Sequence, residues 1–224
     1  MILLLDRIRN PYVKLLKVVG KSRSKAASAL QYAASIRLGG RIMPYHICEC
    51  TELWQVEASD DLLAYQYDVY GIPHPKMSPW LQANKALRLL VLRDGVVAGS
   101  LDLVSDSPEL GLPIEKCYPN EISHLRSQGT GLAEVNRFVT DHLRSVELYS
   151  LLNETARRLQ DWPGDVAVCG VHPSRVSLYR IYMGWVVEAL PKVLPLSDVA
   201  VILMTLTREG FRESVLGRRM RKSR

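Results

Sequence analysis

The chain is poor in the features that mark disulfide-rich, zinc-binding and membrane-spanning proteins. Its four cysteines, at positions 48, 50, 117 and 169, form no Cys-x-x-Cys pair and accompany only five histidines. Neither a disulfide framework nor a structural zinc site is therefore supported. No apolar run approaches the roughly 20 residues that a membrane-spanning helix needs, and the apolar residues 2–5 precede Asp6 and Arg7, the wrong order for a signal peptide. We expect reduced thiols, no bound metal and a cytoplasmic location.

Low-complexity and collagen-like compositions are also absent. Glycine and proline together contribute 26 of the 224 residues, and charged residues make up 23%. Apolar residues make up 47%, which is ample for a buried core. The composition predicts one large domain, or one domain with an appendage.

Charge is distributed unevenly along the chain. Residues 1–41 carry a net charge of +8 and residues 208–224 carry +5, so that residues 42–207 carry −7 within a total of +6. Residues 1–40 are predicted to form a basic amphipathic helical extension, whose basic face could bind an anionic membrane surface, an acidic partner protein or the rest of the chain. The tail 208–224 has no aromatic residue among its closely spaced basic residues 218–222, which favours a disordered, solubilising end over nucleic-acid binding.

Residues 41–207 predict a mixed α/β fold. Asp94-Gly95 between two apolar runs is a strong β-hairpin signal. The order of the elements predicts one βαβ crossover and several antiparallel neighbours, hence a mixed, partly antiparallel sheet flanked by helices. Helices are expected over residues 59–70, 120–128, 145–162 and 174–183, and strands over residues 41–50, 87–92, 96–104, 132–140, 166–171, 185–190 and 199–206.

Two segments carry candidate functional residues. In the strand 132–140, simple alternation places Glu134, Asn136 and Phe138 on one face. An acid and an amide on an otherwise apolar face need hydrogen-bond partners, which either a structural network or a catalytic site would supply. The second segment, residues 172–185, places Tyr179 in mid-helix, where a tyrosine is usually part of the core.

Together with Gly111-Leu112-Pro113, Tyr118-Pro119, Leu125-Arg126 and Gly129, these segments resemble the N-acyl amino acid synthases, enzymes of the GNAT acyltransferase fold related to the acyl-homoserine-lactone synthases. The resemblance covers roughly residues 42–207. It implies a GNAT-like fold and transfer of a long fatty acyl chain from the phosphopantetheine arm of acyl carrier protein to the α-amine of an amino acid. It implies no tightly bound cofactor and no nucleic-acid partner.

The turn after the strand 132–140 bears on the donor. Acetyl-CoA enzymes of this fold normally place a glycine-rich turn there, whose backbone N–H groups hold the pyrophosphate. Residues 141–145 contain no glycine, and Asp141 would repel a diphosphate. Acyl carrier protein brings a single phosphodiester, which Arg144 and the start of the next helix could bind.

The resemblance also implies roles for particular side chains. Glu134 would deprotonate the acceptor ammonium, directly or through a water, if burial raises its pKa toward neutrality. Backbone N–H groups near Phe138, Val139 and Thr140 would polarise the thioester carbonyl, and Tyr179 would donate a proton to the departing sulfur. The remaining substrate- or acyl-binding candidates are Asn136, Arg137, Arg144, His172 and Tyr118.

The acceptor pocket and its ligand are left open by the residues. Candidates for lining it are Tyr65, Tyr67, Tyr70, Tyr118 and His142, and candidates for binding an α-carboxylate are Arg126, Arg137 and Arg175. Alternative functions are an acyl-homoserine-lactone-type synthase, a lyso-aminolipid synthase and a non-catalytic membrane- or lipid-binding module. An amphiphilic product would suit peripheral contact of residues 2–20 with the inner membrane.

Overall fold

A computed structural model describes residues 45–72, 78–143, 145–162, 164–195 and 197–222. The predicted N-terminal helices lie outside these residues. Residues 45–224 form one compact unit, built on a sheet in the order β1-β2-β3-β4-β5-β8-β6, with β7 paired to β8. The strands are β1 (Tyr45–Glu49), β2 (Ala86–Arg93), β3 (Val96–Ser105), β4 (Leu132–Thr140), β5 (Val166–Val171), β6 (Val186–Val187), β7 (Lys192–Val193) and β8 (Ala200–Thr207).

Among the strands of the described residues, only β4 and β5 pair in parallel, and every other neighbouring pair is antiparallel. The parallel pair is joined by α6 (Ser145–Asp161), which is the predicted crossover. The prediction of a mixed, partly antiparallel sheet is therefore confirmed. The short strand β7 was not predicted.

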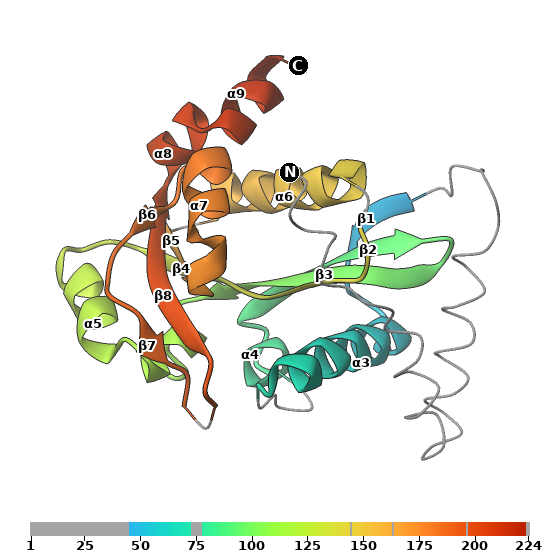
Figure 1. Cartoon of the computed structure of the whole chain (residues 1–224), viewed down its shortest axis with the longest axis horizontal. Coiled ribbons are helices and arrows are strands. Elements are labelled where there is room, and N and C mark those ends of the chain that lie inside the picture. The colour runs from blue at the N-terminus through green and yellow to red at the C-terminus, as the bar shows by residue number, and fades with distance from the viewer. Residues whose placement is uncertain (1–44, 73–77, 144, 163, 196, 223–224) are drawn as a thin grey trace. The chain divides into compact units, whose positions relative to one another are not determined.

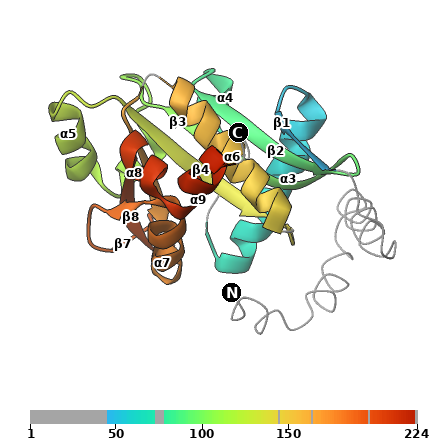
Figure 2. The same cartoon turned by 90° about the horizontal axis from the view of Figure 1, so that it is seen from above.

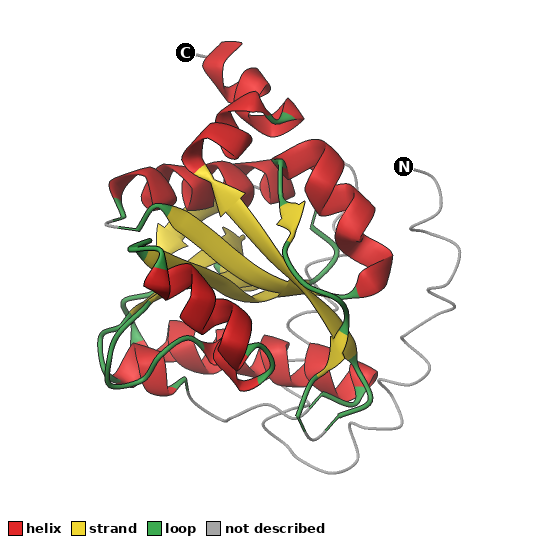
Figure 3. Cartoon of the chain, turned by 90° about the vertical axis from the view of Figure 1, so that its left-hand side faces the viewer, coloured by secondary structure: helices red, strands yellow, loops and turns green. Residues whose placement is uncertain are grey.

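Helices cover both faces of the sheet (Figure 1). One face carries α3 (Leu53–Tyr70), α4 (Pro79–Gln82) and α5 (Pro119–Ser127), together with the 3₁₀ turn η2 (Pro113–Lys116). The other face carries α6, whose Leu151 is fully buried. In Figure 2 α6 crosses over the sheet strands, and Figure 3 shows the sheet between its helical layers.

The predicted hairpin is formed by β2 and β3. Asp94 and Gly95 have φ of 52° and 76°, the left-handed pair that a two-residue turn of type I′ requires. Both strands are buried almost throughout. Cys48 and Cys50 lie on one face near β1, as predicted, and like Leu62 of α3 they pack against the cluster of Leu90, Leu92 and Val97.

Two predicted elements differ in extent or form. Helix α3 begins at Leu53 rather than at residue 59, because the Gln55 side chain accepts hydrogen bonds from the backbone N–H groups of Thr51 and Glu52. The predicted helix 174–183 is divided into η3 (Pro173–Arg175), α7 (Val176–Leu178) and a π-helical turn η4 (Tyr179–Met183). It ends at Gly184, whose φ is 80°.

The prediction of a disordered tail is wrong for the described residues of 208–224. The chain continues as α8 (Arg208–Glu213) and α9 (Val215–Lys222). Phe211 and Leu216 are buried in the same apolar cluster as Trp185. These two apolar side chains hold the basic segment against the domain, although its composition resembles that of a solvated end.

Candidate active site

The central feature of the site is the point where β4 and β5 part. They pair only over residues 132–134 and 166–168. Beyond these residues β4 continues along β3 to Thr140, and β5 continues along β8 to Val171. The backbone pairing between β4 and β5 is therefore lost beyond Glu134, as expected for strands that splay.

Glu134 is the last residue of β4 that pairs with β5. Its side chain is buried, and its Oε2 accepts a hydrogen bond of 2.8 Å from the backbone N–H of Ile114. Burial raises the pKa of Glu134 to about 8; the Ile114 hydrogen bond acts in the opposite direction, and the Glu115 charge raises the pKa further. A carboxyl group with this pKa can exchange a proton near neutral pH.

A β-bulge follows Glu134 and changes which side chains share a face. Asn136 pairs with Asp102 and Val139 with Ser100, so two residues of β4 oppose Leu101. Arg137 has φ of 51°, and its N–H donates to Asn136 Oδ1 at 2.6 Å. The extra residue interrupts the two-residue alternation on which the sequence prediction relied.

The predicted grouping of Glu134, Asn136 and Phe138 on one face is consequently wrong for Phe138, which follows the bulge, while Glu134 and Asn136 precede it in unbroken register. Phe138 packs in the apolar cluster that contains Leu151 of α6. Arg137 instead points toward α3, with ion-pair distances of 3.8 Å to Asp60 and 3.8 Å to Asp102. Asn136 holds the bulge through the Arg137 N–H.

A buried ionic network lies beside the bulge. Arg88 donates to Asp102 at 2.6 and 3.0 Å, to Asp60 at 2.7 Å and to Ser59 at 2.7 Å. The sequence analysis did not identify this network. A signal was present, because Arg88 and Asp102 are each flanked by apolar residues in the interior of their strands and pair directly across the hairpin.

Tyr67 of α3 faces this group of residues. Burial raises its pKa first; the Arg137 charge lowers it, and Asp102 and Glu134 raise it. Among the tyrosines considered for the acceptor pocket, Tyr67 is thus close enough to Glu134 and Arg137 for the charges of both to shift its pKa. Tyr65 is exposed, and the side chain of Tyr70 lies outside the described residues. His142 is exposed, with its Nε2 3.7 Å from Asp141.

Tyr179 lies in η4 and packs against the apolar cluster around Trp185, whose ring it meets edge-on at 6.2 Å. Burial raises the pKa of Tyr179, the Cys169 thiol raises it further, and Arg175 lowers it. Cys169 in turn has its pKa raised by burial and by Glu134. The position of Cys169 on β5, just beyond the last pair with β4, therefore links the surroundings of Glu134 and Tyr179.

Tyr118 does not have the predicted substrate-binding environment. Its ring is fully buried, and its hydroxyl lies 2.6 Å from the Val201 carbonyl and 2.9 Å from the Leu190 carbonyl. The same oxygen accepts a hydrogen bond from the Lys192 N–H. These contacts attach the chain before α5 to β7 and β8, so Tyr118 serves the fold.

The other candidates have local positions of different kinds. His172 is exposed, and its Nδ1 accepts a hydrogen bond from the Ser174 N–H at 3.3 Å, which caps η3. Val139 is buried, and the Thr140 carbonyl accepts a bond from Gln66. Arg144 lies outside the described residues.

The three arginines considered for a carboxylate are also separated. Arg126 binds Asp106 and Glu115, away from the bulge, and Arg175 is exposed on η3. Arg137 is the one of the three that shares a face with Glu134.

A small apolar cavity of about 50 Å³ lies on the α6 side of β5 and β8. Its walls include Ala156, Met183, Trp185, Leu206 and Phe211. By the measure in which one water needs roughly 10–15 Å³, it holds only a few atoms.

Two further observations concern the described residues as a whole. They include no group of three or more His, Cys, Asp and Glu side chains arranged to hold a metal ion. No helix within them is long and apolar enough to span a bilayer.

The chain matches a known protein family. The family model described as "N-acyl amino acid synthase FeeM" matches residues 62–207. Among curated proteins, none matches the sequence.

Solved structures share the fold. FeeM, an N-acyl amino acid synthase from uncultured soil microbes, superposes with a TM-score of 0.72 at 20% identity, covering 80% of this chain and 99% of that one. The acyl-homoserine-lactone synthase LasI gives 0.53 at 13% identity, covering 79% and 98%. An acyl-CoA N-acyltransferase from Pseudomonas aeruginosa gives 0.53 at 15% identity, covering 73% and 98%.

The family match spans the hairpin, the bulged strand β4 and the helix that carries Tyr179, and the solved structures share their GNAT-like arrangement. The chain belongs to the FeeM family of N-acyl amino acid synthases and is an N-acyltransferase.

Proposed function

We propose that this enzyme transfers a long-chain fatty acyl group from the phosphopantetheine thioester of an acyl carrier protein to the α-amine of an amino acid. The observation that carries the proposal is the buried Glu134 carboxyl, with a pKa of about 8, at the point where β4 and β5 part. The splayed strands would admit a pantetheine arm between them, and Glu134 would stand at its inner end.

The reaction requires a base, groups that bind the oxyanion and an acid. Glu134 takes a proton from the acceptor ammonium, directly or through a water, and the amine attacks the thioester carbonyl carbon. Backbone N–H groups after the bulge stabilise the resulting oxyanion. The Arg137 N–H is occupied by Asn136, so we assign this role to residues 138–140. The C–S bond then breaks, Tyr179 protonates the leaving thiolate, and the second proton lost by the attacking nitrogen restores the Tyr179 hydroxyl.

The start of α6 supports a carrier-bound donor over free acyl-CoA. Glu147 is buried in its first turn and pairs with Arg93 at 2.5 and 2.9 Å. Burial raises the pKa of Asp141, in the preceding turn, to about 7. A diphosphate at this turn would meet two carboxyl groups. Arg144 remains our prediction for binding the single phosphodiester of the carrier.

Exposed arginines support an acidic partner. Helix α9 contacts η4, the turn that contains Tyr179, so the basic C-terminal segment lies beside the proposed site (Figure 1). A positive surface speeds encounter with a strongly acidic carrier protein. The exposed arginines of η3, η4, α8 and α9 are Arg175, Arg180, Arg208, Arg212, Arg218, Arg219 and Arg221.

Arg137 and Tyr67 are our candidates for holding the acceptor amino acid. Arg137 shares a face with Glu134, so a carboxylate bound by its guanidinium would bring the neighbouring ammonium toward the base. The charges of Arg137 and Glu134 both shift the pKa of Tyr67, which places its hydroxyl near the two groups. For the acyl chain we propose the apolar cavity near Trp185, whose side-chain walls must move apart to admit a long chain.

The test is a reaction of the purified full chain with carrier protein bearing short, medium or long acyl groups. The acceptor pool contains the amino acids, ornithine and S-adenosylmethionine, and products are identified by mass spectrometry. An N-acyl amino acid formed from the carrier thioester, and not formed by Glu134→Gln, is the expected result. A lactone product would indicate a homoserine-lactone synthase, an acylornithine product would favour aminolipid synthesis, and equal rates with acyl-CoA would remove the argument for the carrier.

Peripheral membrane contact is a second proposal, favoured by an apolar strip. Residues 178–193 contain several exposed apolar side chains close to Arg175 and Arg180, and this combination suits an anionic bilayer. Binding to anionic vesicles that is unchanged in Ile181→Ser and Leu190→Ser would contradict it. The exposed members of the strip are Leu178, Ile181, Tyr182, Val186, Val187, Leu190 and Val193.

A further inference from the structure

We propose that Arg126 is a positioning residue for Glu134: by holding Glu115 and Asp106, it fixes the turn whose Ile114 N–H binds the Glu134 carboxyl group. Arg126 does not touch the proposed reacting atoms. This inference rests on the proposed function, in which Glu134 is the base.

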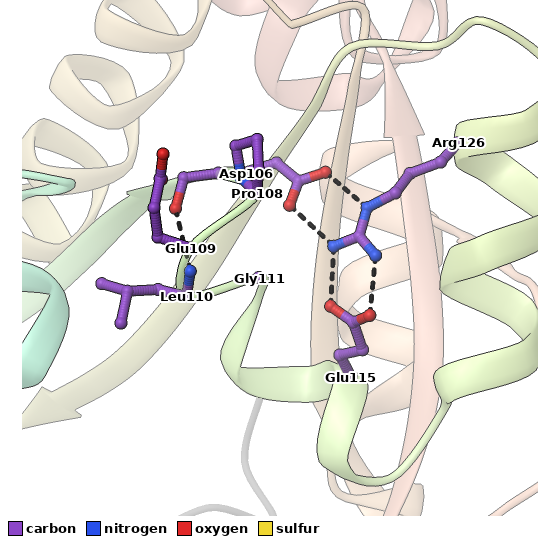
Figure 4. A pocket seen from close by; sticks show the side chains of 8 residues that line it. Asp106, Pro108, Glu109, Leu110, Gly111, Glu115 and Arg126 are labelled. Atoms are coloured by element: carbon purple, nitrogen blue, oxygen red, sulfur yellow. Dashed lines mark hydrogen bonds and ion pairs between the residues drawn. The ribbon is translucent and has the colours of Figure 1, made fainter.

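The first step is the arginine clamp itself (Figure 4). Arg126 of α5 donates to both carboxylate oxygens of Asp106 at 2.7 Å and to both oxygens of Glu115 at 2.6 Å. Asp106 follows β3, and Glu115 lies in η2. Such two-pronged pairs fix direction as well as distance, so the clamp sets the position of η2 relative to β3 and α5.

The second step leads from the clamp to Glu134. Glu115 Oε2 accepts a hydrogen bond of 3.2 Å from the Leu112 N–H, and the Ile114 N–H donates to Glu134 Oε2 at 2.8 Å. Ile114 therefore lies immediately beside the clamped Glu115 in one tight turn. If Glu115 moves, the neighbouring Ile114 N–H moves with it, and its hydrogen bond to Glu134 is weakened.

The approach to the turn is also tightly constrained. Gly111 has φ of 60°, and a Cβ atom there would lie 2.5 Å from Glu115 Oε2. Its carbonyl accepts a hydrogen bond of 3.0 Å from the Trp80 indole. The positive φ favours glycine here, and a side chain at this position would displace the Glu115 carboxylate from the clamp.

The third step is electrostatic. The titratable groups whose charges act together with that of Glu134 are Glu115 of η2, Tyr67 of α3, Cys117 after η2 and Cys169 of β5, and Arg137 shares its face. Burial raises the pKa values of Tyr67, Cys117 and Cys169, which keeps these three groups neutral. Glu115 is ionised, because its hydrogen bonds with Arg126 lower its pKa. Arg126 therefore balances the negative charge nearest to the Glu134 turn.

The experiment measures the ionisation of Glu134 without substrate. Full-length protein labelled with ¹³C at the glutamate side-chain carboxyl is titrated by NMR, and Glu134 is assigned from the signal missing in Glu134→Gln. Arg126→Gln should raise the Glu134 midpoint, because the hydrogen bond is loosened and Glu115 is left unbalanced. Glu115→Gln should lower it by on the order of half a pH unit, because the like charge is removed while the amide oxygen can still accept from Arg126 and from the Leu112 N–H, which keeps the turn in place.

Arg158→Gln provides a matched control. Arg158 also binds two glutamates, Glu154 at 2.8 Å and Glu49 at 3.2 Å, and its side chain is 31% exposed against 33% for Arg126. Its replacement should leave the Glu134 titration unchanged.

Opposite shifts of the Glu134 midpoint in Arg126→Gln and Glu115→Gln support the inference even if no acyl transfer is detected. The inference can therefore hold when the proposed function fails, and the two outcomes are distinguishable. In active protein, the lower limb of the kcat/KM profile should shift in the same directions. Unchanged midpoints, or shifts of both variants in one direction, would overturn it. If Arg126→Gln does not fold, an unchanged or raised midpoint in Glu115→Gln alone overturns it.

Discussion

Replacing Glu134 by Gln should separate the energetic cost of burying this carboxyl group from its use in the reaction. The pKa of Glu134 is raised from 4.5 to about 8 in the folded protein. The folded state therefore binds the Glu134 proton more tightly than the unfolded state, so the contribution of Glu134 to the free energy of unfolding is fully present below pH 4.5. It decreases as the pH rises and is lost by about pH 8, a difference of roughly 5 kcal/mol.

Gln keeps an acceptor oxygen for the Ile114 N–H but carries no charge. The free energy of unfolding of Glu134→Gln, relative to the wild type, should therefore increase by about 3 kcal/mol between pH 5.5 and pH 9. Urea denaturation at several pH values measures this difference. The raised pKa of Asp141 contributes equally to both proteins and cancels. At pH 9, where wild-type Glu134 is ionised, turnover of the variant should be lower by on the order of 100-fold.

Glu57→Gln is the control, because Glu57 is exposed on α3 and its replacement should give a curve parallel to that of the wild type. A stability difference between Glu134→Gln and the wild type that does not vary with pH would refute the raised pKa. A variant with the expected stability profile but unchanged turnover would refute the role of Glu134 as base while leaving the electrostatic reasoning intact.

Three further predictions concern other residues. Tyr179→Phe should lower kcat by on the order of 100-fold with little change in KM, because it removes the proton for the leaving thiolate; steady-state kinetics with a carrier thioester tests this, and an unchanged kcat would exclude the role. Tyr118→Phe should lower the free energy of unfolding by about 1–3 kcal/mol without changing kcat, because the hydroxyl binds the Leu190 and Val201 carbonyls. A large loss of activity in a stable variant would show that Tyr118 contributes to substrate binding or catalysis. Gly184→Ala should destabilise the protein far more than Gly129→Ala, since both have positive φ but only at Gly184 would a Cβ meet the Gly210 carbonyl; equal melting temperatures would contradict this packing.

Several features could be predicted from the sequence because their causes are local. The Asp94-Gly95 turn determines the β2–β3 hairpin, since few residue pairs adopt two left-handed conformations in succession. The apolar spacing of residues 148–159 predicts α6, and Gly184 predicts the end of the helix that carries Tyr179. Glu134 was identifiable as a candidate because an acid in an apolar strand needs a particular environment.

Other features depended on contacts between distant segments. One extra residue at Arg137 moved Phe138 to the α6 side of the sheet, and no local pattern in the sequence indicates such a bulge. The hydroxyl of Tyr118 was assigned to the fold only once β7 and β8 were in place. Phe211 and Leu216 ordered a tail whose charge predicted disorder.

By itself, the sequence determined the hairpin and the crossover helix, because turn chemistry and apolar periodicity act within a few residues. The roles of Glu134 and Tyr179 were predicted from the family resemblance. Only the tertiary structure decided that Arg137 joins Glu134 on one face and that Arg126 serves a carboxylate clamp. Register, bulges and ion pairs are settled when strands and helices from distant parts of the chain compete for the same buried space.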